Sequence, residues 1–213
     1  RRRTTHCVGC CAPIEDRSFS NSNTNLALSM LRVLEVASVV LVVLALPLVV
    51  GKAKHQLQRE IPDAAKVFDS FDSIVAIFDI DKDGDLDCLS GARTYYDKHS
   101  STATYVWFLK GLNGHKAQNI SYEVRPGRKP NQFLVKDQDT DEPVQEGTYD
   151  YTDYKSCVVM EMPYNDSEEC VLWVTWNVVN DIPKDCQDQY EDNCDDAKLA
   201  YDQESCGAFE NFN

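Results

Sequence analysis

Eight short segments rich in β-branched and aromatic residues follow one another between residues 73 and 178, and this pattern constrains the fold most strongly. Clusters of Gly, Pro, Asn and Asp separate them, such as LNGHK and PGRKPN. The segments are SIVAIFDI, CLSGARTYYD, TATYVWFLKGL, AQNISYEVR, NQFLVKD, VQEGTYDYT, CVVMEMP and CVLWVTWNV. Short strands with turn residues at regular spacing predict an antiparallel all-β domain, either a sandwich or a barrel.

Two short helices are predicted to flank these strands. The segment QLQREIPDAAKVFDSFD has apolar residues at helical spacing and Pro62 near a start, which predicts a helix over about 62–70. The polar tail predicts a helical turn over about 183–191, followed by a coil held by cysteines. Eight antiparallel strands between two short helices describe a calyx-type barrel, a fold that can hold one small ligand inside.

The segment 30–51 has the layout of a secretory signal peptide. It begins at Met30, the first methionine, and has an early cation before an apolar run over 36–50. A membrane anchor is the competing interpretation, but this run of 15 residues contains Pro47 and is shorter than the roughly 20 residues of a spanning helix. Residues 1–29 lack apolar periodicity, and we interpret them as non-native translated sequence or a disordered basic segment.

Cleavage after Gly51 would leave residues 52–213, long enough for one secreted, extracellular barrel domain. The whole chain has a net charge of −14; without residues 1–51 it keeps 16 basic and 32 acidic residues, a net charge of −16. This charge argues against nucleic acid and anionic membranes as partners and is compatible with a cationic ligand. We expect a monomer that binds a small molecule.

Six of the nine cysteines lie in this domain, and an even number after a signal peptide predicts three disulfides. Zinc is the alternative, but the domain has no C-x-x-C pair. Spacing alone leaves all 15 pairings open. Two sequons, at Asn119 and Asn165, predict N-glycosylation. The six cysteines are Cys88, Cys157, Cys170, Cys186, Cys194 and Cys206.

The segment DIDKDGDLDCLS, residues 79–90, has the spacing of a calcium-binding EF-hand loop over its first half. Its last position is Ser90, which cannot supply the bidentate carboxylate that such a loop needs, and strand-like segments replace the flanking helices. The D-K-D-G sequence is also a hairpin signal. We therefore predict a solvated acidic hairpin between the first two strands, with weak calcium binding by residues 79–87 as the alternative.

The sequence does not indicate an enzyme. It has no nucleophile elbow, no phosphate-binding loop and no metal-ligand spacing, and its domain histidines lie before the barrel or near turns. We expect no catalytic residue, metal or cofactor.

The segment CVVMEMPYNDSEECVLWVTWNVVNDIPKDC resembles the tick salivary lipocalins, the histamine-binding family. That family has a Cys on its seventh strand, Glu-Leu-Trp on its eighth, and Ile-Pro and a second Cys before a short helix. Here Cys157, Val171-Leu172-Trp173, Ile182-Pro183 and Cys186 stand in these places. The family's Asp-Ala-Trp-Lys corresponds to residues 63–66, without the Trp, and the likeness covers residues 60–206.

The resemblance implies an eight-stranded, disulfide-stapled lipocalin barrel that sequesters a host mediator stoichiometrically, above all a biogenic amine such as histamine or serotonin. It also implies which cysteines pair, and each such staple can stabilise by about 2–4 kcal/mol. The implied disulfides are Cys88–Cys206, Cys157–Cys186 and Cys170–Cys194.

Strand alternation and the family register together predict the barrel lining, because alternate residues of a strand face the same side. On the fourth strand a glycan on Asn119 would require its neighbours to face inward; on the seventh, Cys157 faces outward to its disulfide. The predicted ligand-binding residues are Gln118, Ile120, Tyr122, Phe133, Val135, Val158, Val171 and Trp173, with Met160 beside them.

Two carboxylates expected around an amine are missing. Val171 replaces the Glu of Glu-Leu-Trp, and Gln118 stands at another inward Glu position of the family. Glu146 or Asp150 on the sixth strand could replace one of them. The mostly apolar lining suits a lipid mediator, such as a leukotriene or fatty acid, at least as well. A packed interior is a further alternative, in which the protein would bind a host protein through its surface.

Overall fold

A computed structural model describes residues 57, 59–80, 83–165, 167–194 and 197–209. The segments 1–29 and 30–51, interpreted above as upstream sequence and signal peptide, lie outside these described residues. Within the described part of the chain, no helix has both the length and the apolar character needed to cross a membrane.

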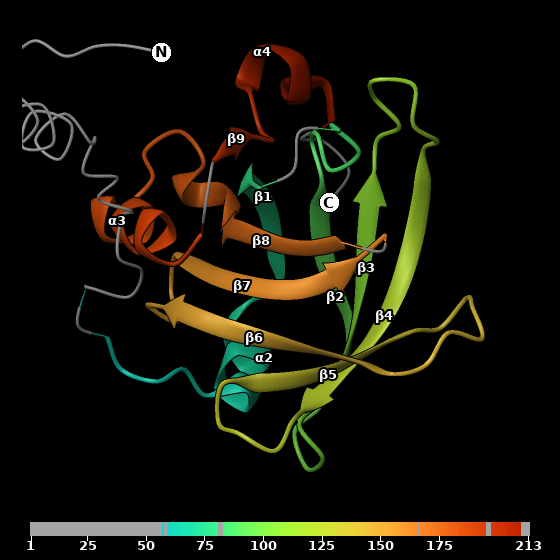
Figure 1. The fold of residues 1–213 in the computed structure, drawn as a ribbon, viewed down its shortest axis with the longest axis vertical. Helices are drawn as coiled ribbons and strands as arrows, with labels where there is room; N and C mark the ends of the chain where they lie inside the picture. Colours follow the sequence, from blue (N-terminus) through green and yellow to red (C-terminus); the bar gives the residue numbers. More distant parts are fainter. Residues whose placement is uncertain (1–56, 58, 81–82, 166, 195–196, 210–213) are drawn as a thin grey trace, which may run out of the picture. The chain divides into compact units, whose positions relative to one another are not determined.

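Eight antiparallel strands form a closed barrel (Figure 1). Each strand from β2 to β8 pairs with the next, and β1 pairs with both β8 and β2, which closes the sheet. This arrangement confirms the predicted barrel. The strands are β1 Ser73–Asp79, β2 Ser90–Asp97, β3 Thr102–Leu109, β4 Gln118–Pro126, β5 Gln132–Asp137, β6 Gln145–Thr152, β7 Cys157–Tyr164 and β8 Ser167–Val174.

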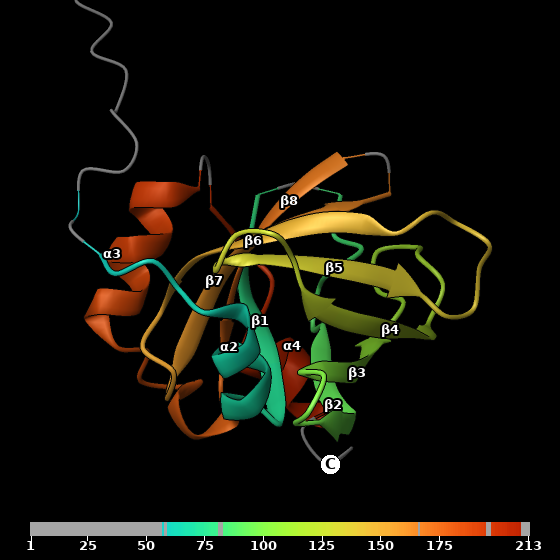
Figure 2. The ribbon, with the colours of Figure 1, turned by 90° about the horizontal axis from the view of Figure 1, so that it is seen from below.

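Helix α2, Ala64–Ser70, closes one end of the barrel (Figure 2). It begins after Pro62, and the Asp63 side chain caps it by accepting a hydrogen bond from the Lys66 amide at 3.2 Å. The Tyr105 hydroxyl donates to the Phe71 carbonyl at 2.8 Å, which ties β3 to the chain just after the helix. The structure confirms the helix predicted over 62–70.

Helix α3, Lys184–Asn193, packs on the outer face of the barrel and confirms the helix predicted near 183–191. Two disulfides hold it there: one joins the helix to β7, and the other joins Cys194, just after the helix, to β8. A third joins Cys88, in the β1–β2 connection, to Cys206 in the C-terminal tail. The tail adds the short strand β9 Lys198–Leu199, helix α4 Gln203–Cys206 and two 3-10 turns, η1 Trp176–Val178 and η2 Gly207–Phe209. The disulfides are the implied ones, Cys88–Cys206, Cys157–Cys186 and Cys170–Cys194.

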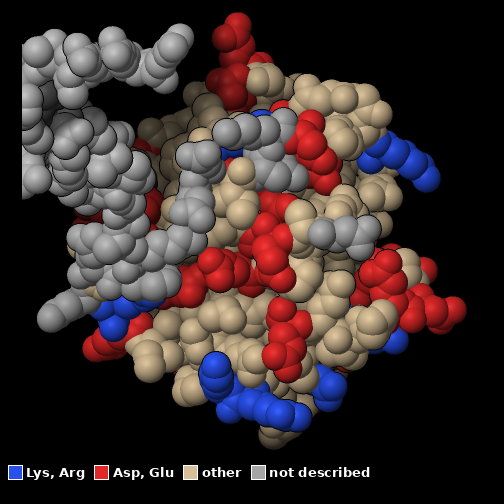
Figure 3. All heavy atoms as spheres, in the orientation of Figure 1, with Lys and Arg blue, Asp and Glu red and all other residues tan. Residues whose placement is uncertain are grey.

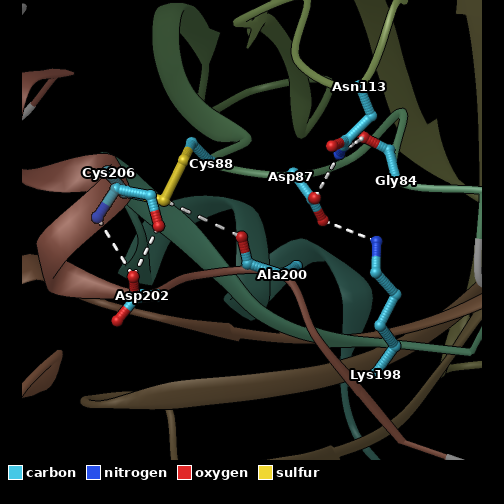
Figure 4. The surroundings of a disulfide bond; sticks show 9 residues. Gly84, Asp87, Cys88, Asn113, Lys198, Ala200, Asp202 and Cys206 are labelled. Atoms are coloured by element: carbon cyan, nitrogen blue, oxygen red, sulfur yellow. Dashed lines mark hydrogen bonds and ion pairs between the residues drawn. A yellow bond between two sulfur atoms is a disulfide. The ribbon is translucent and has the colours of Figure 1, made fainter.

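The β1–β2 connection is not the solvated hairpin predicted from its acidic sequence. Leu86 and Leu89 are fully buried against the barrel interior, and Asp79 is buried as well. The Asp87 carboxylate contacts the Lys198 amine and the Asn113 amide, each at 2.6 Å (Figure 4). The two leucines fold the segment inward, because their burial outweighs the solvation of the neighbouring acids.

The same segment forms no calcium-type cluster among its described residues. Groups of acidic, histidine or cysteine side chains close enough to share a metal occur at two other places in the described chain. Each of these groups counts a cysteine that is in a disulfide and is therefore no thiolate ligand, so neither group supplies three metal ligands.

Candidate functional site

The barrel interior holds a small central cavity of about 40 Å³. Fourteen apolar or aromatic side chains from α2 and the barrel strands line it. Pockets for small ligands usually measure about 300–1,000 Å³, and a cavity of this size holds only a few water molecules. In this conformation the interior is therefore close to the packed alternative considered from the sequence.

Aromatic side chains fill the interior. The Phe133 ring stacks on Tyr149 with their centroids 4.5 Å apart, and Trp107 lies 5.2 Å from Trp173 between ring centroids. Gly147 makes room for Phe133, because a Cβ there would lie 2.2 Å from the end of its ring. The packing of Phe133 in the core thus requires a glycine at position 147.

A second, larger pocket of about 390 Å³ lies at the end of the barrel opposite α2. The start of β4, the 138–144 loop between β5 and β6, and the β7–β8 turn surround it. We call it the mouth pocket. Its lining consists of Gln118, Asn119, Ile120, Tyr122, Asp137, Asp139, Thr140, Glu142, Pro143, Gln145, Pro163, Tyr164 and Asn165.

The mouth pocket is acidic. It contains the carboxylates of Asp137, Asp139 and Glu142, and none of the described residues that line it is Lys, Arg or His. Figure 3 shows acidic side chains gathered where the 138–144 loop projects from the barrel. The loop is fixed to β4 by a backbone hydrogen bond, in which the Gln138 N–H donates to the Ser121 carbonyl at 2.8 Å. A cation in this pocket would meet opposite charge, and no basic side chain among the described lining residues would oppose it.

Two tyrosines lie between the mouth pocket and the interior. Tyr122 lines both cavities, and Tyr164 lines the mouth pocket while packing on the core. Burial, reinforced by nearby acidic groups, raises the pKa of Tyr164 to about 12 and the pKa of Tyr122 still further. Both phenols are therefore neutral at physiological pH and can offer a ring face or a hydroxyl to a ligand.

The structure divides the predicted ligand-binding residues between these two cavities. Val171 is fully buried in the core and lines neither. Gln118 and Ile120 line only the mouth pocket, and Gln118 is exposed. Those that line the central cavity are Tyr122, Phe133, Val135, Val158, Met160 and Trp173.

Neither acidic residue proposed on the sixth strand faces the interior. Asp150 lies in a β-bulge between Tyr149 and Tyr151, and its carboxylate is within 4.8 Å of the Glu161 carboxylate and of the Cys170 sulfur, which is bonded to Cys194 next to α3 on the outer face. Glu146 is exposed and accepts a hydrogen bond from the Gln132 amide at 2.5 Å. Both carboxylates therefore lie away from the interior, so neither replaces a missing interior carboxylate.

One buried carboxylate on the inner face was missed from the sequence. Glu169 is 1% exposed, lies two residues before Val171 on the same face of β8, and pairs across the sheet with Met162, which lines the central cavity. The Ser167 hydroxyl donates a hydrogen bond to it. The segment CVLWVTWNV predicts a strand that begins at residue 170, whereas β8 begins at Ser167, so Glu169 lies outside the predicted strand. Counting back in steps of two from Trp173 would have found it.

The two sequon asparagines are both exposed. Asn119 lies near the start of β4, while Asn165 lies in the β7–β8 turn with a φ of 47°. The Asn165 amide donates to the Asp85 carboxylate at 2.9 Å. Both lie beside the mouth pocket, and their glycosylation stays a prediction.

Comparison with known proteins gives one family and a set of solved structures. The model of the tick histamine binding protein family matches residues 78–208. No curated protein matches the chain. Among solved structures, an AM182 serotonin complex is 14% identical with a TM-score of 0.49, covering 68% of this chain and 95% of that one.

Two further solved structures have similar values. The tryptamine complex of the amine binding protein of Rhodnius prolixus is 13% identical with a TM-score of 0.48, covering 76% of this chain and 97% of that one. Japanin from Rhipicephalus appendiculatus, bound to cholesterol, is 14% identical with a TM-score of 0.46, and the match covers 62% of this chain and 94% of that one.

Proposed function

This chain belongs to the tick histamine-binding protein family, and on that premise we propose that it sequesters a protonated biogenic amine, such as histamine or serotonin. The amine would bind in the mouth pocket, and binding would be stoichiometric, without chemical change of the ligand. We further propose that the protein is secreted and acts outside the cell, as the predicted signal peptide and the three disulfides suggest.

The acidic lining of the mouth pocket is the observation that supports this proposal. A protonated amine that leaves water needs an opposite charge, because its desolvation otherwise costs more than its contacts return. Asp137, Asp139 and Glu142 supply that charge in a pocket of about 390 Å³. Tyr122 and Tyr164 line the same pocket, and the part of each ring that borders it would contact an imidazole or indole ring, or the ammonium group itself.

The central cavity is a poorer place for the amine. Its volume of about 40 Å³ is too small for a ring with an ethylamine chain, and its lining is entirely apolar or aromatic. The buried carboxylate of Glu169, on the inner face of β8, lines neither cavity. An amine could reach it only after interior side chains had moved.

A surface-acting binder of a host protein is the second candidate, because the packed interior favours it. The structure supports a lipid mediator as the ligand less well than the apolar sequence of the lining did. The interior has the apolar lining that such a ligand needs, but not the volume.

Titration calorimetry on the disulfide-intact protein tests the proposal, with histamine, serotonin, a leukotriene and a fatty acid as separate ligands. We expect saturable binding of at least one amine and a threefold to tenfold weaker affinity in Glu142→Gln. Glu161→Gln is the matched control, because Glu161 lies on β7 outside both cavities.

The control should bind the amine within twofold of the wild type. Absence of amine binding would contradict the proposal, and so would equal losses in Glu142→Gln and Glu161→Gln. Binding of the lipids alone would move the function to the lipid alternative.

A further inference from the structure

We propose that Trp107 divides the barrel in two and limits the length of the amine that the mouth pocket accepts. This inference rests on the proposed amine binding and adds to it the property that selects among amines. Small amines would bind at the mouth, whereas the further methylenes of long aliphatic amines would add no affinity because the space behind the pocket is blocked.

The position of Trp107 supports this role. It lies on β3, is 5% exposed, and lines the central cavity. Its ring centroid lies 5.0 Å from that of Tyr122 and 5.9 Å from that of Tyr164, the two aromatic residues of the mouth pocket. It also lies 5.2 Å from the ring of Trp173, which lines the central cavity and not the mouth pocket. The indole therefore contacts rings that belong to both spaces.

The neighbouring strands hold the indole in this place. Trp107 pairs across the sheet with Gly91 on β2 and with Ile120 on β4. A Cβ at Gly91 would lie 3.5 Å from the indole Cδ1, which is ordinary contact, so the ring lies directly over the glycine. A ring packed on several sides in this way acts as a fixed wall.

Removal of the indole would join the two spaces. An engineered apolar cavity of about 150 Å³ stays dry and binds benzene, and truncation of a buried Trp leaves a cavity of that order. Here such a cavity would connect the acidic mouth pocket with the apolar central cavity. An alkyl amine could then keep its ammonium group at the carboxylates and extend its chain into the interior.

The test is a series of n-alkylamines from butylamine to decylamine, titrated by calorimetry into the wild type and Trp107→Ala. In the wild type the affinity should stop rising with chain length after the first few methylenes. In Trp107→Ala it should rise by up to about fourfold for each further methylene, the value for a fully buried CH₂. Trp107→Leu, which keeps more of the core, should give an intermediate limit.

Trp176→Leu is the control, because Trp176 packs outside the barrel and donates to the Ser73 hydroxyl at 3.1 Å. It should show the wild-type limit. An unbroken rise up to decylamine in the wild type would overturn the proposal, and so would an unchanged limit in a folded Trp107 variant. Loss of butylamine binding in Trp107→Ala would make the indole part of the amine site, and would overturn it as well.

Benzene binding, followed by NMR, separates this inference from the proposed function. Benzene should enter Trp107→Ala or Trp107→Leu and should not enter the wild type. If the wild type binds no amine at all, the proposed function fails, and the benzene measurement still decides whether the indole fills the space between the cavities.

Discussion

The central cavity and the mouth pocket belong to the same barrel and share Tyr122, yet they differ in size and in chemistry. The central cavity is apolar and measures about 40 Å³, whereas the mouth pocket is acidic and measures about 390 Å³. The strands, with α2 and the residue after it, line the first, whereas the second depends on a loop and a turn in addition to strand residues. In this barrel the inward strand residues mainly form a core, and the larger space lies among the connections at the end opposite α2.

The largest effect that distinguishes the two regions should come from Phe133→Ala. Phe133 is 1% exposed and packs only in the interior, so the variant should lose about 3–5 kcal/mol of unfolding free energy. Its amine affinity at the mouth should stay within twofold of the wild type. Chemical denaturation and calorimetry measure the two quantities, with Leu134→Ala, on the outer face of β5, as the control. A parallel loss of affinity would show that the regions are not separate.

A smaller loss of unfolding free energy is expected for Gly147→Ala. The new Cβ would lie 2.2 Å from the Phe133 ring, and such overpacking costs about 1–3 kcal/mol. The double variant with Phe133→Ala should be more stable than the sum of the two losses predicts, because the clash is gone. Additive losses, measured by denaturant unfolding, would mean that the strain lies elsewhere.

The next effect is a loss of stability at alkaline pH, caused by Tyr164, which lies between the two regions. The pKa of Tyr164 is raised from 10 to about 12, chiefly by burial, so above pH 10 the unfolded chain loses a proton that the folded chain keeps. This contribution to stability is complete below pH 10 and is lost as the pH rises towards 12. Tyr164→Phe should lose less stability over this range than the wild type in pH-dependent unfolding. Tyr95→Phe, at an exposed position, should follow the wild type.

The smallest effect on stability should come from the mouth carboxylates. Asp139→Asn removes an exposed charge and should change the unfolding free energy by less than about 0.5 kcal/mol. The same variant should weaken amine binding, and added salt should reduce the difference, because screening weakens exposed charge pairs. A large loss of stability, measured by thermal unfolding, would show that the loop supports the core.

The fold was predictable because its signals are local and periodic. Each of the eight segments alternates or has β-branched residues between turn residues, and each became a strand. The disulfide pairing was not available from spacing, and only the family resemblance implied it. Alternation alone leaves open which face of a strand is inward, and the Asn119 sequon and the family resemblance supplied that choice for Tyr122, Phe133 and Trp173, which line the central cavity.

The mouth pocket was not predictable by the same means. The segment DQDTDEP was interpreted only as a separator between two strands, although Asp137, Asp139 and Glu142 line the pocket. Loop residues follow no period, and hydrogen bonds to a distant strand, such as the one from Gln138 to Ser121, fix their positions. Glu169 was missed for another reason. The ends of a strand are harder to predict than its middle, and the predicted strand begins three residues after the start of β8 at Ser167.

The disulfide between Cys88 and Cys206 joins residues 118 positions apart and encloses every strand from β2 to β8. A protease that cuts the exposed 138–144 loop would therefore produce two fragments that remain covalently joined. The nicked protein should migrate as one species on a non-reducing gel and separate only after reduction. The loop that forms the mouth pocket can thus be cleaved while the barrel stays a single covalent unit.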